Sequence, residues 1–228
     1  MTDVVSVLDA DAGLAELIPP PRRTQARQAT AAATIEVFAG SWRQPREPDR
    51  VRGGYGLLLL EGLIIRRAGL EGRYGAELLG PGDLVRPWQR DGVLPVDWTW
   101  RAVTDARLAV LDTRWVARAA PWPQLGVELA GRAVARAVRT VTAMAIAQQP
   151  KLEDRLWMLF WELADRYGRV HADGVRIAVP LTHESLSHLA GARRPSVSGA
   201  LTKLSQSGRL RREGGLWVLS GEPPALAA

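Results

Sequence analysis

One stretch decides the fold of the last third of the chain: Leu181–Ser220, LTHESLSHLAGARRPSVSGALTKLSQSGRLRREGGLWVLS. Thr182 stands where its hydroxyl can cap the free backbone N–H groups of a first helix, and Gly191 can close that helix in the left-handed conformation. A second helix follows after three residues, with Pro195 at its start, where a missing N–H costs nothing. The apolar residues of this second helix recur at helical spacing and predict its buried face: Val197, Ala200, Leu201 and Leu204. The stretch therefore predicts a helix-turn-helix.

The outer face of the second predicted helix is small, polar and poor in acid. A helix that enters a major groove needs such a face, with hydrogen-bond donors at its N-terminal end. Arg193 and Arg194 stand at that end, where a guanidinium can reach guanine or phosphate. From Leu181 to Gly215 the chain has six Lys or Arg against two acids. The candidate DNA-binding residues are Thr182, His183, Arg193, Arg194, Ser196, Ser198, Thr202, Lys203 and Arg211.

A basic hairpin is predicted directly after these helices. Leu210–Arg212 and Leu216–Leu219 flank the turn Glu213-Gly214-Gly215, a pattern typical of a wing. Arg209, Arg211 and Arg212 suit a neighbouring DNA backbone. A helical hairpin with a solvated basic face is the plainer alternative. The cap, the short turn, the proline start and the basic hairpin together favour a winged helix-turn-helix over it.

The sequence from Ile35 to Asp112 has the pattern of β-structure, with short apolar runs separated by glycines. Gly56–Leu60 and Leu63–Arg67 flank Glu61-Gly62 and predict a hairpin, and residues 96–103 alternate with a period of two. Several short strands at near-regular spacing indicate a sandwich or small barrel. In the first 34 residues we expect one short helix, Ala10–Ile18, ended by three prolines.

Helical patterns follow the strands. Trp115–Gln149 carries a long stripe of small apolar residues and is stopped by Pro150. Such a helix can pack on its own domain or pair with its copy, since small residues allow close approach. We favour pairing. A second amphipathic helix is predicted over Lys151–Tyr167, then a polar turn over Arg166–Gly174 and a short strand over Val175–Val179.

Composition excludes several classes of protein. The chain of 228 residues has no cysteine, so disulfides, thiolate metal sites and thiol catalysis are ruled out. The N-terminus has neither the basic nor the apolar region of a secretory signal, and the most apolar run, Leu57–Ile65, is too short to span a bilayer. The formal net charge of +6 agrees with a polyanionic partner. We expect a soluble, cytoplasmic protein.

With these residues in view, the chain resembles the Crp–Fnr family of transcription regulators. The resemblance is carried by LTHESLSHLAGARRPSVSGALTKLSQSGRL and, upstream, by a Gly82-Asp83-Leu84 turn ahead of a long helix. It implies an α+β fold with a jelly-roll-like β-roll, a long dimerisation helix and a C-terminal winged helix-turn-helix. The implied domains are a sensor over residues 1–114, a dimerisation helix over 115–149 and a DNA-binding domain over 150–228.

The resemblance also implies roles for single residues. Thr182 and Ser196 match positions that contact phosphates, and Arg194 matches a base-reading arginine. Pro195 and Gly199 replace a glutamate and a second arginine of the best-known members, so the target sequence is expected to differ. Cyclic-nucleotide binders of the family carry a Gly-Glu turn and a later Arg-Ser or Arg-Thr, and neither is present here. Cyclic AMP is therefore not the expected effector.

Nine tryptophans are many for this length. The plain interpretation is that they fill the core. The alternative is an aromatic-lined pocket for a planar or apolar effector, with Trp88, Trp98 and Trp100 as candidates.

The prediction is a sequence-specific DNA-binding transcription regulator, a homodimer on a palindromic operator. Its partners are double-stranded DNA and a second copy of the chain; RNA polymerase and an unknown small-molecule effector are left open, and no membrane is expected. We predict no catalytic residue, no metal and no cofactor, because the β-rich part contains no histidine and no phosphate-binding glycine loop appears. Two alternatives remain: a protein-interaction module built on a degenerate winged helix, and a β-roll enzyme.

Overall fold

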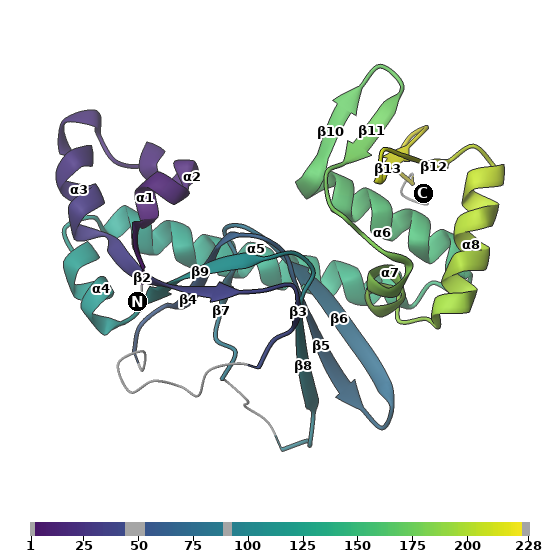
Figure 1. The fold of residues 1–228 in the computed structure, drawn as a ribbon, viewed down its shortest axis with the longest axis horizontal. Coiled ribbons are helices and arrows are strands. Elements are labelled where there is room, and N and C mark those ends of the chain that lie inside the picture. Colours follow the sequence, from purple (N-terminus) through teal and green to yellow (C-terminus); the bar gives the residue numbers. More distant parts are fainter. Residues whose placement is uncertain (1–2, 44–52, 89–92, 225–228) are drawn as a thin grey trace. The chain divides into compact units, whose positions relative to one another are not determined.

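The computed structural model describes residues 3–43, 53–88 and 93–224 (Figure 1). Gln89–Gly92 lie outside the described residues. The chain forms two compact units: an N-terminal unit of residues 1–66 and 78–139, and a C-terminal unit of residues 67–77 and 140–228. Within the described part, no helix is both long and apolar enough to cross a membrane.

Two antiparallel sheets form the β-roll. In the first, the strands lie in the spatial order β1 (Val4–Ser6), β2 (Ala31–Val37), β9 (Ala106–Leu111), β4 (Gly56–Glu61) and β7 (Leu84–Val85). In the second, the order is β3 (Gly40–Ser41), β8 (Asp97–Ala102), β5 (Ile64–Leu70) and β6 (Arg73–Leu79). The predicted α+β fold with a jelly-roll-like domain is confirmed.

Strand β4 lies at the centre of the packing. Leu57 and Leu59 belong to the core between the two sheets, whereas Leu58 and Leu60 belong to the core that the helices cover. Both faces of this strand are therefore buried, and for this reason its sequence is a continuous apolar run instead of an alternating one.

The predicted hairpin between Gly56–Leu60 and Leu63–Arg67 is wrong. Strand β4 lies between β9 and β7, so both of its edges are already paired, and β5 belongs to the other sheet. Gly62 marks the corner at which the chain changes sheets, with φ of +84°. A Cβ at Gly62 would lie 2.2 Å from the carbonyl oxygen of Asp105, so only glycine fits.

The expected helix Ala10–Ile18 is confirmed only in part. Helix α2 spans Ala12–Glu16, and Asp11 separates it from a preceding helix, α1 (Val7–Ala10). The Asp11 carboxylate accepts from Leu14 N at 3.1 Å as the cap of α2. A short 3-10 turn η1 (Pro20–Arg22) and a helix α3 (Arg23–Ala29), neither of them predicted, follow.

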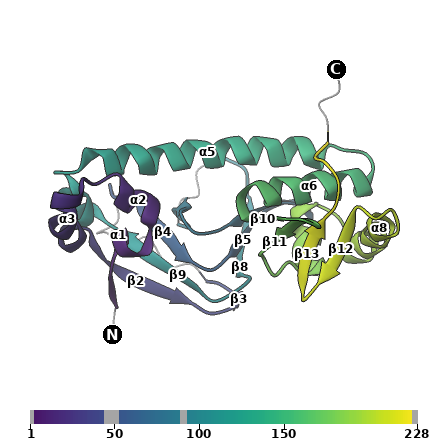
Figure 2. The ribbon, with the colours of Figure 1, turned by 90° about the horizontal axis from the view of Figure 1, so that it is seen from above.

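The predicted helical segment Trp115–Gln149 contains two helices, α4 (Thr113–Ala119) and the 25-residue α5 (Pro123–Ala147) (Figure 2). Leu125 and Leu129 are buried in the core beneath the first sheet. The opposite face of α5 carries five apolar side chains that are 61–73% exposed: Val127, Val134, Val138, Val141 and Met144. The helix therefore has one face packed on its own unit and one apolar face open.

Residues 152–219 of the C-terminal unit form three helices and a four-stranded sheet in the order β10-β11-β13-β12 (Figure 1). The elements are α6 (Leu152–Tyr167), β10 (Gly168–His171), β11 (Gly174–Ile177), α7 (His183–Leu189), α8 (Arg194–Gln206), β12 (Leu210–Glu213) and β13 (Leu216–Leu219). The predicted winged helix-turn-helix is confirmed. The predicted polar turn over Arg166–Gly174 is wrong in part, because β10 pairs with β11 across a turn at residues 172–173.

Candidate nucleic-acid interface

The helix-turn-helix begins at a side-chain cap. Thr182 Oγ1 accepts from Ser185 N at 3.1 Å, which satisfies one free donor at the start of α7. Gly191 follows α7 with φ of +59°, so the chain reverses without strain. The buried face of α8 consists of the four predicted residues, each at most 4% exposed: Val197, Ala200, Leu201 and Leu204. The opposite face of α8 is left for solvent or a partner.

The wing is a two-residue hairpin. Gly214 and Gly215 have φ of +56° and +84°, the pair of positive angles that a tight turn between two twisted strands requires. Arg212 on β12 lies opposite Trp217 on β13, and the Trp217 indole donates from Nε1 to Leu181 O at 3.0 Å. That bond ties the wing to the segment that leads into α7.

Two arginines at the start of α8 remain available. Arg193 is the residue before the helix and Arg194 is its first residue, and both side chains are exposed. Among the described residues, neither makes a hydrogen bond or an ion pair through its guanidinium. Ser196 is exposed on the same turn. Together they present the donor-rich, acid-free end that a groove-binding helix needs.

The hydroxyls of two other predicted contact residues, Ser198 and Thr202, already make hydrogen bonds within the C-terminal unit. Ser198 Oγ donates to Arg194 O at 3.2 Å and lies 2.9 Å from Nδ1 of His183, and Thr202 Oγ1 donates to Ser198 O at 3.1 Å. Between them, a Cβ at Gly199 would meet no atom within 4 Å among the described residues. The middle of the outer face is thus shallow and open.

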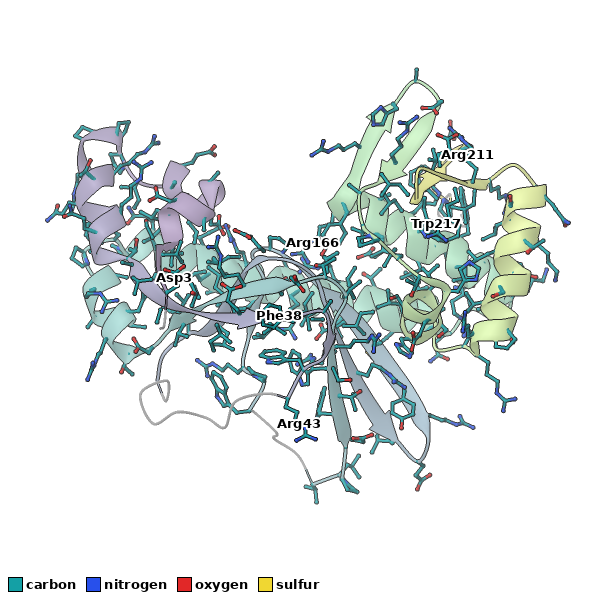
Figure 3. All side chains as sticks on the ribbon, viewed as in Figure 1. Asp3, Phe38, Arg43, Arg166, Arg211 and Trp217 are labelled. Atoms are coloured by element: carbon teal, nitrogen blue, oxygen red, sulfur yellow. The ribbon has the colours of Figure 1, made fainter. Side chains whose placement is uncertain are left out.

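Lys203 and Arg211 are held by acids of their own unit. Lys203 Nζ lies 2.5 Å from Glu153 Oε1 of α6. Arg211 contacts Glu213 and Asp173, each at 2.5 Å (Figure 3). Arg212, which the set of candidate residues omits, contacts the face of Trp217 instead, with its guanidinium carbon 5.2 Å from the ring centroid. The alternation of a strand places Arg211 and Arg212 on opposite sides, but the sequence does not say which side meets an acid.

In the N-terminal unit the structure brings aromatic residues together in the second sheet. The guanidinium carbon of Arg66 lies 5.0 Å from the ring centroid of Trp98 and 5.6 Å from that of Trp100, and Trp42 meets Trp100 edge-on at 5.5 Å. Trp88 packs against the same core. Sequence reasoning missed Arg66, although its spacing of two from the buried Ile64 on β5 was a usable signal.

The turn at residues 80–83 is held by hydrogen bonds from within the N-terminal unit. Asp83 is 3% exposed; its Oδ2 accepts from Gly80 N at 2.9 Å and its Oδ1 from Arg139 at 2.8 Å. Arg136 donates to Leu84 O at 2.6 Å, and Arg132 binds Asp11 of the helical segment. Three arginines of α5 thus hold this helix to the turn and to α2.

The comparisons with known proteins agree with this geometry. Residues 154–227 match the family model described as a Crp-like helix-turn-helix domain. FixK2 from Bradyrhizobium japonicum has a similar structure, with a TM-score of 0.63 and 19% identity over 86% of this chain and 99% of that chain. A CRP/FNR-family transcriptional regulator from Thermus thermophilus has a TM-score of 0.58 and 22% identity over 82% of this chain and 93% of that chain.

A third similar structure is that of the c-di-GMP-responsive global regulator CLP from Xanthomonas campestris. Its TM-score is 0.60, with 17% identity over 93% of this chain and 100% of that chain. No curated protein sequence matches the chain significantly. The family model thus defines residues 154–227 as a Crp-like helix-turn-helix domain, and the fold of the chain is similar to that of CRP/FNR-type regulators. The predicted resemblance to the Crp–Fnr family is thereby confirmed.

Proposed function

We propose that this chain is a sequence-specific transcription regulator that binds a palindromic DNA operator as a homodimer. The observation that carries the proposal is the start of α8, where Arg193 and Arg194 are exposed and their guanidiniums bond to none of the described residues, on a helix face without acids. Arg194 and Ser196 contact the major groove, and Arg193 and the Thr182 hydroxyl contact backbone phosphates. Because Gly199 leaves the centre of α8 open, part of the readout depends on DNA shape.

The open apolar face of α5 supports the dimer. From Val134 to Met144 its apolar residues recur every three or four positions, and Val127 lies seven residues earlier, which is the spacing of a seam between two paired helices. Two copies related by a two-fold axis present their α8 helices to major grooves about 34 Å apart. Under this proposal residues 1–114, 115–149 and 150–228 act as sensor, dimerisation helix and DNA-binding domain, and the protein works in the cytoplasm, where RNA polymerase is accessible.

The internal hydrogen bonds of the turn at residues 80–83 support an effector other than cyclic AMP. Both carboxylate oxygens of Asp83 already accept hydrogen bonds within the unit, one of them from Arg139. If an effector binds the N-terminal unit, the cluster of Trp98, Trp100 and Arg66 is the place that the contacts favour. Trp100 is 5% exposed, and its Nε1 has no hydrogen-bond partner among the described residues.

The experiment that tests this function is selection of bound sequences from a random duplex library by the purified protein without added ligand. We expect one palindromic motif, with half-sites one helical turn apart, and a mass of two chains per duplex by light scattering. Arg101→Ala, an exposed change on β8, serves as the matched control for Arg194→Ala. If only the Arg194 variant loses the motif, the readout assignment is supported. Recovery of no motif from any preparation would argue against a DNA regulator that is competent without an effector.

A further inference from the structure

His183 lies where three elements of the C-terminal unit meet. It is the first residue of α7, its Nδ1 lies 2.9 Å from Ser198 Oγ on α8, and its ring stacks on Trp217 of β13 at 6.1 Å. The two ring planes differ by 29°, and Trp217 is itself 5% exposed. The orientation of this imidazole is therefore fixed by packed neighbours.

The hydrogen bonds also determine which ring nitrogen carries the proton. Ser198 Oγ lies 3.2 Å from the Arg194 carbonyl oxygen, which can only accept. The hydroxyl has one hydrogen, so Ser198 donates it to the carbonyl and the imidazole Nδ1–H donates to Ser198. In the neutral ring Nε2 then carries the lone pair, and it makes no hydrogen bond with any described residue. A phosphate oxygen that approached a neutral His183 would meet this lone pair.

Two cations act on this ring. They are Arg212 of β12, whose guanidinium lies against Trp217, and Arg194 of α8. The neighbours from α8 and β13, Ser198 and Trp217, are neutral, and Glu184 follows on the same helix. Burial, then Arg212, then Arg194 lower the pKa of His183 below its ordinary value. The free protein therefore holds a neutral His183 at neutral pH, next to two arginines that attract phosphate.

We propose that His183 takes up a proton when the C-terminal unit binds duplex DNA, and that the imidazolium donates from Nε2 to a backbone phosphate. The inference rests on the DNA binding proposed above. The phosphate charge offsets Arg194 and Arg212, so the charged ring becomes favourable only in the complex. Arg212 is the wing cation at this site, because Arg211 is bound to Asp173 and Glu213.

The sign of the pH effect follows from this order of pKa values. His183 has a higher pKa in the complex than in the free protein, so binding is coupled to proton uptake. Affinity rises as the pH falls from the pKa of the complex to the pKa of the free protein, and it is constant outside that window. Since the contact is to a phosphate, the effect appears on random-sequence DNA as well.

The experiment measures affinity of the full-length protein for a random-sequence duplex at constant salt from about pH 8 to about pH 5.5, where each unit of pKa rise gives about a tenfold gain per subunit. In His183→Asn the amide can still donate to Ser198, but nothing replaces Nε2. This variant is expected to lose the pH dependence. His171→Gln on β10 removes an exposed histidine of the same unit and should keep the pH dependence.

A second measurement is independent of affinity. The His183 C2 proton is identified in NMR spectra by its absence from His183→Asn and is titrated with and without the duplex. We expect a pKa below the ordinary histidine value in the free protein and a higher one in the complex. Binding with equal pH dependence in wild type and His183→Asn, or an unchanged His183 pKa in the complex, overturns proton uptake alone. Absence of binding at every pH overturns the proposed DNA binding together with it.

Discussion

Several arginines of the N-terminal unit donate to carbonyls and carboxylates of that unit, whereas the two at the start of α8 donate to none of the described residues. Arg118 binds the carbonyls of Ala29 and Ala31 at 2.9 and 2.7 Å, and Arg139 binds the buried Asp83. Arg193 and Arg194 have the same five donors each and use none of them toward a residue that the structure describes. A guanidinium that remains solvated keeps its donors for a partner.

The same contrast exists inside the C-terminal unit. Arg211 is bound by two acids and stabilises the contact between the wing and the β10–β11 turn, while its neighbour Arg212 lies on an aromatic face. Basic residues that look equivalent in the sequence are thus divided by the fold into structural and available ones.

The largest effect is expected for Val141→Glu on the open face of α5. A carboxylate at a seam between two apolar helices would be buried without a partner, so the dimer should dissociate. Loss of the second binding module should weaken operator binding on the order of 100-fold or more. Sedimentation and a binding titration measure both effects. Val170→Glu, on β10 and 85% exposed, is the matched control; a dimer that persists in the Val141 variant would refute this seam.

Arg139→Met should affect stability and leave DNA contacts intact. It removes the Arg139 guanidinium from the carboxylate of Asp83, which is 3% exposed. We expect a loss of about 2–4 kcal/mol in the free energy of unfolding of the N-terminal unit. Urea denaturation followed by tryptophan fluorescence measures it, with Arg101→Met on β8 as a surface control. Equal midpoints for the two variants would show that the pair with Asp83 contributes no net stability.

The contrast also shows which parts of the structure could be predicted from the sequence. The cap at Thr182, the glycines at 191, 214 and 215 and the apolar spacing of α8 are local signals, so the winged helix could be predicted almost in full. The pairing of β4 could not, because Glu61-Gly62 has the same composition whether the chain turns back in one sheet or crosses to another. Which arginine meets an acid depends on pairs distant in sequence, such as Arg211 with Asp173. Local patterns carry no information on such pairs.

Arg194→Ala should have the opposite profile to Arg139→Met. Removing a guanidinium that makes no hydrogen bond with the described residues leaves the unfolding free energy within about 0.5 kcal/mol of wild type. Specific DNA binding should weaken by about 1–3 kcal/mol, with relaxed preference at one base pair. Competition titrations against single-base variants of the selected operator measure this. An equal loss on operator and random DNA would instead make Arg194 a phosphate contact.

The smallest effect is expected for Lys203→Ala. Its ammonium is paired with Glu153, and the hydrogen bond from Lys203 lowers the pKa of that carboxyl below its ordinary value. To bind a phosphate the lysine must leave this acid, so the slope of log affinity against log salt should fall by less than about one. Glu153→Gln sharpens the test, because it frees the lysine without moving it. If the lysine reaches DNA, this variant should bind random duplex more tightly and with a steeper salt slope. If Lys203→Ala alone changes the slope of log affinity against log salt by a full unit, the ion pair with Glu153 breaks readily on binding. An acid neighbour then does not by itself remove a cation from the interface.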